Sequence, residues 1–368
     1  MPSAKLEAGS LGWHDNRLGG VRGLTVGPIE NALHPGRGYG SEACAESFRR
    51  ARAWGANWVS ITPFGRVWDL KPSGVSLTFE QPFRDNRARV VTAIRQAHAE
   101  GLRVLLVPHL WVESGEWRGQ MDPGGAEAWQ EWSKAYGAFV REWAKVAAES
   151  NADMFALGVE LRSWVTTTHA ESFADTIRSV RAIYPGLITY AANWDDADRT
   201  VILGELDVIG INAFFPLAES HRASPEELLR HSRKIALDLA SLAQRWGKPI
   251  LFTEFGYTAR TDTAVRPWEW PEHLSGIELD ETAQADAYQA LLTPLLEAPW
   301  FAGFFVWRMF SDWNDTSQEP DWGFSPLGKQ AEFVLRDAYR AHWASDGPLL
   351  NKLPVPGAGR VGAPSPAR

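Results

Sequence analysis

The sequence has very little cysteine and no excess of positive charge. Cys44 is the only cysteine among 368 residues, which excludes an intramolecular disulfide framework and metal sites built from several thiolates. Lysine and arginine total 37 against 45 aspartate and glutamate, so the formal net charge is −8. The protein therefore lacks the positive field that attracts nucleic acid or anionic membranes, and we expect neither as a partner.

Long apolar runs are also missing. No window offers the roughly 20 consecutive apolar residues that a membrane span needs. Residues 1–15 lack a basic segment followed by an apolar stretch, so no signal peptide is expected in this chain. The compartment stays open: we expect an extracellular protein if a signal peptide has been removed, and a cytoplasmic one otherwise.

The composition is that of a protein with a large buried core. Apolar residues make up 45% of the chain and charged residues 22%. We expect one catalytic domain over residues 21–343, because barrels of this length often form a single unit. Residues 1–20 would be an N-terminal extension, and the proline- and glycine-rich residues 344–368 an extended tail.

Short β-branched or apolar runs alternate with longer runs of helical period along the chain. We predict strands at residues 21–26, 58–62, 104–108, 154–159, 188–191, 208–211, 250–253 and 301–307. Helices are predicted from the N-cap Ser41 to the stop at Gly55, over 85–100 and 126–149, from the N-cap Ser224 to Trp246, and over 329–343. Eight strands in strict alternation with helices predict an α/β protein with a single (β/α)₈ TIM barrel.

Aromatic residues are abundant, with 19 tryptophans. Those of the helix over 126–149 recur at spacings of three and four residues, which indicates core packing. Cys44 is on the buried face of its own helix and is expected to be a core thiol. Other tryptophans follow strands, and flat aromatic faces suit the apolar faces of sugar rings.

Polar and aromatic residues follow the predicted strands, where the active site of such a barrel lies. We expect substrate-binding residues among Arg66, Trp68, His109, Trp111, Asn193, Trp194, Asn212 and Tyr257. Trp268, Trp270 and Trp313 are further candidates for walls of a cleft, because the segments 258–280 and 308–328 exceed ordinary loop lengths. Each of these tryptophans has an alternative interpretation as loop packing.

Two glutamates stand out by position. Glu160 directly follows the fourth predicted strand and Glu254 the seventh, and these strands face each other across the mouth of a barrel. Retaining glycoside hydrolysis needs two carboxyl groups about 5 Å apart, one to protonate the leaving oxygen and one to attack the anomeric carbon. The alternative is a pair of structural rim carboxylates bound to Arg162 or Arg260.

Three segments resemble the signatures that clan A glycoside hydrolases carry on strands 4, 7 and 8: Gly158-Val-Glu160, Phe252-Thr-Glu254-Phe-Gly-Tyr257 and Gly303-Phe-Phe-Val-Trp307. Three more resemble glycoside hydrolase family 113, the β-1,4-mannanases: Gly55-Ala-Asn-Trp58-Val, Gly210-Ile-Asn-Ala-Phe-Phe-Pro216 and Ser325-Pro-Leu-Gly-Lys329. The resemblance covers residues 21–339. It implies Glu160 as the acid/base, Glu254 as the nucleophile and Trp307 as the platform under the sugar that is cleaved.

The chain departs from the clan pattern beside both glutamates. Many members carry asparagine directly before the acid/base, where it binds the sugar 2-hydroxyl, and Val159 stands there in this sequence. Asn193 or Asn212 would have to serve instead. Phe214 and Phe215 occupy the place where relatives often carry a tyrosine that hydrogen-bonds the nucleophile. Tyr257 or another donor would then have to compensate.

Other motifs point to no competing chemistry. The Gly36, Gly38 and Gly40 string lies some ten residues past the first strand and is interpreted as a loop. His109 and Glu113 could be part of a metal site, but no third ligand is evident. We expect no cofactor.

The leading hypothesis is thus a retaining endo-acting hydrolase of β-1,4-mannosidic bonds in mannan or glucomannan. The same two glutamates would also suit a hydrolase or transglycosylase of another β-linked polysaccharide. A third possibility is a catalytically silent barrel that binds polysaccharide.

Overall fold

The protein is described from a computed structural model, which places residues 20–269 and 276–341. The predicted tail over 344–368, the N-terminal extension up to residue 19, and Trp270 lie outside the described residues. No helix within the described ranges is long and apolar enough to cross a membrane.

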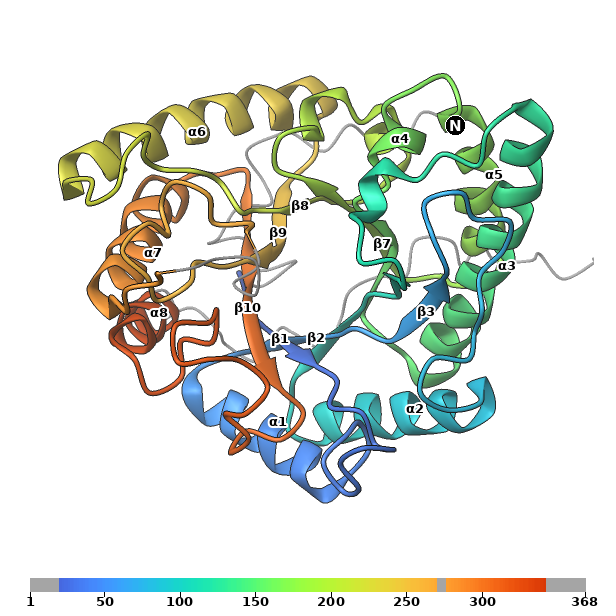
Figure 1. Ribbon diagram of the computed structural model, residues 1–368, viewed down its shortest axis with the longest axis horizontal. Coiled ribbons are helices and arrows are strands. Elements are labelled where there is room, and N and C mark those ends of the chain that lie inside the picture. The colour runs from blue at the N-terminus through green and yellow to red at the C-terminus, as the bar shows by residue number, and fades with distance from the viewer. Residues whose placement is uncertain (1–19, 270–275, 342–368) are drawn as a thin grey trace, which may run out of the picture.

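Eight parallel strands close into a barrel in the order β1-β10-β9-β8-β7-β6-β4-β2 (Figure 1). They are β1 (Val21–Gly27), β2 (Trp58–Ile61), β4 (Arg103–Leu106), β6 (Met154–Val159), β7 (Leu187–Asn193), β8 (Ile209–Asn212), β9 (Ile250–Phe255) and β10 (Phe301–Phe310). All eight were predicted from the sequence, β6 with its bounds unchanged. The (β/α)₈ fold is confirmed.

Helices form a ring around the barrel (Figure 1). They are α1 (Glu42–Trp54), α2 (Phe83–Ala99), α3 (Ala126–Ser150), α4 (Arg162–Val165), α5 (Ala170–Arg181), α6 (Pro225–Trp246), α7 (Glu281–Leu295) and α8 (Gln330–Ala341). Three short 3₁₀ helices lie in the connections: η1 (Arg118–Gln120), η2 (Ala197–Arg199) and η3 (Val201–Glu205).

The helices α1 and α6 are capped by the residues that the sequence predicted. The Ser41 hydroxyl accepts a hydrogen bond from the backbone N–H of Cys44, and α1 ends at Gly55 in a left-handed conformation (φ 117°). The Ser224 hydroxyl accepts from the backbone N–H of Glu227, and α6 ends at Gly247. Such N-caps stabilise a helix by about 1 kcal/mol each, so they fix where α1 and α6 begin.

Two layers of buried side chains hold the molecule together. The barrel interior is filled by small and branched residues together with Trp58 and Phe305, and Val159 belongs to this group. A larger cluster lies between the strands and the helices, and it contains Cys44 and the aromatic face of α3. The prediction that these α3 aromatics are core residues is confirmed, since they are all buried: Trp129, Trp132, Tyr136, Phe139 and Trp143.

A two-stranded parallel sheet at the barrel mouth was not predicted. It pairs β3 (Phe64–Val67) with β5 (His109–Val112), and Phe64 lies opposite His109. Pro63 and Pro108 precede these strands, and proline cannot donate to a strand ladder. The barrel strands β2 and β4 therefore end before the prolines, and the chain continues as a separate outer sheet. The prediction of one strand over 104–108 was wrong in this respect.

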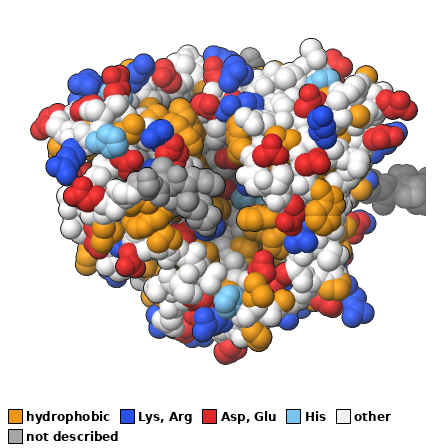
Figure 2. Space-filling view, in the orientation of Figure 1, with side chains coloured by type: hydrophobic (Ala, Val, Ile, Leu, Met, Phe, Trp, Pro, Cys, Tyr) orange, Lys and Arg blue, Asp and Glu red, His pale blue; other side chains and the backbone are white. Residues whose placement is uncertain are grey.

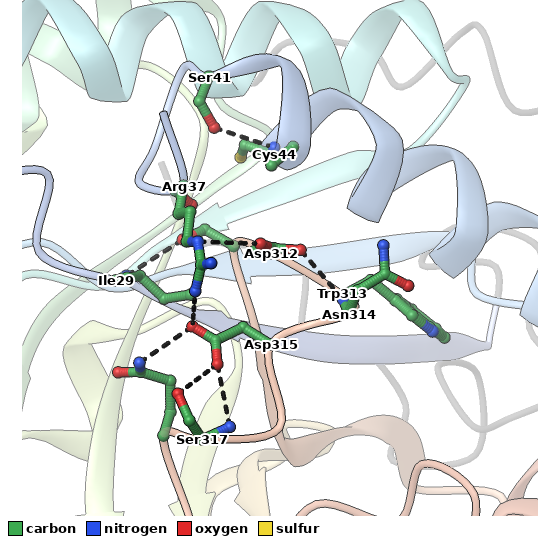
Figure 3. A network of polar contacts seen from close by, with 12 residues as sticks. Ile29, Arg37, Ser41, Cys44, Asp312, Trp313, Asn314, Asp315 and Ser317 are labelled. Atoms are coloured by element: carbon green, nitrogen blue, oxygen red, sulfur yellow. Dashed lines mark hydrogen bonds and ion pairs between the residues drawn. The ribbon is translucent and has the colours of Figure 1, made fainter. Parts of the chain in front are cut away.

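The long segment between β10 and α8 is fastened to the segment between β1 and α1 (Figure 3). Arg37 Nη1 lies 3.1 Å from Asp315 Oδ2, and Arg37 Nε lies 3.7 Å from Asp312 Oδ2. Asp315 also accepts from the backbone N–H of Ser317. This segment encloses a small cavity of about 100 Å³ whose lining includes Trp313 but neither Glu160 nor Glu254.

Candidate active site

The two glutamates lie at the carboxyl ends of their strands. Glu160 is the first residue after β6, and its backbone N–H donates to Ala191 O on β7 at 2.8 Å. Its φ of 54° is in the left-handed region, which is unusual for a residue other than glycine and turns the chain away from the strand. Glu254 is still within β9 and pairs with Asn212 of β8.

Asn212 lies between the two glutamates. Its Nδ2 donates to Glu160 Oε1 at 2.9 Å, and its side chain also hydrogen-bonds Glu254. The Thr253 hydroxyl donates to Asn212 Oδ1 at 2.9 Å, so the oxygen is occupied and the amide N–H₂ faces the glutamates. The Asn212 hydrogen bond lowers the pKa of Glu254, so a donor is present beside this glutamate although Phe214 and Phe215 stand where relatives often carry a tyrosine.

Glu254 is largely shielded from solvent. It is 7% exposed, whereas Glu160 is half-buried. Burial and the charge of Glu160 raise the pKa of Glu254 to about 8, against the opposing effects of Arg118, Arg308 and the Asn212 hydrogen bond. Glu254 therefore takes up a proton more readily than an exposed glutamate does.

His109 lies beside Glu254 at the base of β5. Its Nε2 is 3.5 Å from Glu254 Oε1, and its ring stacks on Trp307 with centroids 6.3 Å apart and an interplanar angle of 16°. Arg118 Nη1 lies 3.4 Å from Nδ1. Burial, with the charges of Arg118 and Arg308, holds the pKa of His109 well below its usual range, so the imidazole is neutral.

Trp117 is a site residue that sequence reasoning missed. Its indole Nε1 donates to Glu160 Oε2 at 2.8 Å, and the Arg162 guanidinium carbon lies 4.4 Å from the centre of its ring. Trp117 precedes η1 in an irregular connection, so no periodicity marked it. The available signal was its place in the loop that follows the third barrel strand.

Several predicted substrate-binding residues lie around the mouth of the barrel. Trp111 belongs to β5 of the outer sheet and is 48% exposed. Trp68 directly follows β3 and is 68% exposed. Arg66 of β3 pairs with Glu113, the residue directly after β5. Trp194 stacks on Trp268 with centroids 5.1 Å apart. The face shown in Figure 2 is hollowed near its centre, and hydrophobic side chains gather around the hollow.

Tyr257 does not join this site. Its side chain is fully buried, and its hydroxyl donates to Phe215 O at 2.9 Å. The expectation that it binds substrate or compensates beside Glu254 is corrected, because the ring packs inward against Tyr288. Asn193 is at the rim, where its Nδ2 donates to Asp195 Oδ1 at 2.6 Å.

Glu160 and Glu254 do not form the rim ion pairs with Arg162 or Arg260 that were the alternative interpretation. Arg162 pairs with Asp195 and Asp196, and Arg260 pairs with Asp262. Within residues 20–269 and 276–341, no group of three or more His, Cys, Asp or Glu side chains could hold a metal ion.

A closed (β/α)₈ barrel with paired glutamates after its fourth strand and at the end of its seventh defines a barrel glycoside hydrolase. The sequence profile of glycoside hydrolase family 113 matches residues 33–329. This match covers most of the chain, and the chain belongs to that family. No curated protein matches the sequence.

Solved structures show the same fold. A family 113 β-mannanase from Alicyclobacillus acidocaldarius, in complex with ManMIm, is 23% identical with a TM-score of 0.75, over 88% of this chain and 97% of that one. A second family 113 β-1,4-mannanase is 22% identical with a TM-score of 0.75, over 87% and 99%. A family 5 enzyme from Streptomyces cattleya, bound to Manβ1-4GlcNAc, is 16% identical with a TM-score of 0.58, over 89% and 82%.

Proposed function

We propose that the protein is a retaining endo-β-1,4-mannanase that acts on mannan or glucomannan through Glu160 and Glu254. The observation that carries the proposal is the meeting of the two carboxyl groups at one side chain. Asn212 pairs with Glu254 across β8 and β9, and its Nδ2 donates to Glu160 Oε1 at 2.9 Å. Retaining chemistry needs this kind of pair, with one proton between two neighbouring carboxyl groups.

The proposed first step breaks the glycosidic bond. Glu160 donates its proton to the leaving oxygen while ionised Glu254 attacks the anomeric carbon, giving a covalent glycosyl-enzyme and a sugar with a free hydroxyl. Burial and the charge of Glu160 raise the pKa of Glu254. The attack therefore needs the proton of the pair to be on Glu160, which leaves Glu254 ionised.

The second step releases the product. Ionised Glu160 takes a proton from a water molecule, whose oxygen attacks the anomeric carbon as the bond to Glu254 breaks. Two inversions retain the β configuration. Trp307, stacked on His109 beside Glu254, is the proposed platform under the sugar being cleaved, and the family assignment supports this role.

Mannan as the substrate is supported by the family and by the mannanases that share the fold. The exposed tryptophans at the mouth, Trp68, Trp111 and Trp268, support an extended β-linked chain as ligand. The same residues would serve a transglycosylase or an enzyme for another β-linked hexose polymer, so the substrate must be measured.

The experiment is a panel of β-mannan, glucomannan, cellulose, xylan and chitosan. It compares the wild type with Glu254→Gln, Glu160→Gln and the surface control Glu142→Gln, whose carboxylate pairs with Lys145 on α3. We expect release of reducing ends from mannan and glucomannan, first as the β anomer by NMR, and its loss in both active-site variants. Unchanged hydrolysis by Glu254→Gln contradicts the nucleophile, α-anomer release contradicts retention, and inactivity on the whole panel favours a binding protein.

A further inference from the structure

Both oxygens of the Glu160 carboxyl group accept an N–H bond from a fixed donor. Asn212 Nδ2 contacts Oε1 at 2.9 Å, and Trp117 Nε1 contacts Oε2 at 2.8 Å. An indole N–H can only donate, and its bond is stronger to a charged oxygen than to a neutral one. The Trp117 bond is therefore sensitive to whether Glu160 carries a proton.

Two residues restrict the position of the Trp117 indole ring. The Arg162 guanidinium lies over its ring at 4.4 Å, and Arg162 Nε is itself bound to Asp196 Oδ2 at 2.6 Å. Gly119 lies against another part of the ring, where a Cβ atom would approach Trp117 Cη2 and Cζ2 to 2.4 Å. Only glycine fits there without moving the ring. Trp117 is thus a preorganised donor aimed at Glu160.

We propose that Trp117 is a positioning residue, which holds Glu160 in the orientation and charge state needed to activate water. This inference rests on the proposed double displacement, in which Glu160 is an acid in the first step and a base in the second. The bond from Trp117 is strongest in the second step, when Glu160 is ionised. It weakens when Glu160 takes up its proton for the next cycle.

The test uses Trp117→Phe, which keeps an aromatic ring between Arg162 and Gly119 but removes the N–H. The substrate is an aryl β-mannobioside with a good leaving group, whose departure needs little acid help. Losing a hydrogen bond to a charged group should slow the second step about 10- to 100-fold. Because the glycosyl-enzyme then accumulates, kcat and KM should fall together while kcat/KM changes little, and azide should restore kcat.

The pH profile on mannan gives a second readout. Without the indole donor the alkaline limb, which reports loss of the acid's proton, should move to higher pH. A ring that only packs would lower kcat/KM without moving this limb. An unchanged kcat and an unchanged limb in Trp117→Phe overturn the proposal.

Two further variants separate position from folding. Gly119→Ala keeps the indole but displaces its ring, and it should reproduce the fall in kcat. Trp246→Phe is the matched control, because it removes an indole N–H that lies at the C-terminal end of α6 and has no hydrogen-bond partner among the residues that the structure describes. It should leave kcat, KM and the pH profile unchanged. Normal kinetics in Gly119→Ala count against the proposal.

A measurement without substrate keeps the inference separate from the proposed activity. The indole ¹H–¹⁵N resonance that disappears in Trp117→Phe should shift in Glu160→Gln, since the charged acceptor is gone. If that resonance does not move, the hydrogen bond is absent and the proposal falls. If it moves but wild type hydrolyses no substrate of the panel, the contact stands and the proposed function falls.

Discussion

The Asn212 amide donates to Glu160 Oε1 at 2.9 Å, and Thr253 on the neighbouring strand β9 fixes the orientation of this amide. An asparagine amide can turn over and present its oxygen instead of its nitrogen. Here the Thr253 hydroxyl donates to Asn212 Oδ1 at 2.9 Å, which keeps the oxygen away from the glutamates. A side chain buried at the end of β8 thus organises carboxyl groups from β6 and β9.

Asn212→Ala should lower kcat/KM on mannan by about 10- to 100-fold, because a hydrogen bond to a charged group contributes about 1.5–3 kcal/mol. Thr253→Val should have a smaller effect in the same direction, since the amide is kept but its orientation is no longer fixed. Steady-state kinetics measure both. A larger loss of kcat/KM in Thr253→Val than in Asn212→Ala would contradict the idea that Thr253 acts by orienting Asn212.

Glu254→Gln should make the protein more stable at alkaline pH. The pKa of Glu254 is raised from 4.5 to about 8 by burial and the Glu160 charge, so between these values the folded state holds a proton that the unfolded state has lost. The contribution of Glu254 to the free energy of unfolding therefore falls as pH rises from 4.5 to about 8, by up to about 1.4 kcal/mol per pH unit. Glutamine carries no such penalty.

Urea unfolding of wild type and Glu254→Gln from pH 5 to pH 9 measures this difference. The gap between the two free energies of unfolding should widen with pH and level off above about pH 8. Glu142→Gln, on the surface of α3, should run parallel to wild type. A gap that is constant with pH would mean that Glu254 titrates normally.

The activity of wild type on mannan should fall above about pH 8, where the pair loses its shared proton and no acid remains.

In Glu160→Gln one cause of the raised Glu254 pKa is removed, so that pKa should drop. With an activated aryl mannobioside, which needs little acid, the variant's rate should rise with pH through a midpoint below 8 and show no alkaline fall. A bell-shaped profile in this variant would argue against Glu160 as the acid.

The sequence predicted the barrel well because its signals are local. The hydrophobic run of β6 and the caps Ser41 and Ser224 specify elements through neighbouring residues alone. The outer β3–β5 sheet was missed because its pairing depends on two prolines at equivalent places in separate strands, Pro63 and Pro108. Such a match is visible only once the strands lie side by side.

The site divides in the same way. Glu160 and Glu254 could be found because each directly follows or ends a strand, and strand ends converge in a barrel. Trp117 reaches Glu160 from an irregular connection 43 residues away, and no pattern records that contact. Tyr257 was misplaced because two residues past Phe255 the chain has turned, so its ring faces the core between β9 and α7.

The His109 imidazole should stay neutral throughout the working pH range. Arg118 can only donate, so the nitrogen that it approaches, Nδ1, accepts, and Nε2 carries the hydrogen that faces Glu254. Burial and the charges of Arg118 and Arg308 hold the His109 pKa well below its usual range. The histidine NMR signal that is lost in His109→Gln should therefore not titrate between about pH 5 and pH 8, unlike an ordinary histidine.

The same tautomer places the Nε2–H of His109 3.5 Å from Glu254 Oε1, where it makes no hydrogen bond within the described residues but can donate to the nucleophile once the two atoms approach. His109→Gln, which keeps an N–H donor, should retain more activity than His109→Phe, which keeps only the ring that stacks on Trp307. His98→Phe is the control, since His98 pairs with Asp153 at the start of the neighbouring strand β6 and away from the glutamates. If His109→Phe retained a kcat/KM equal to or higher than that of His109→Gln, the donor would contribute no more than the stacking ring, and the donor role would be wrong.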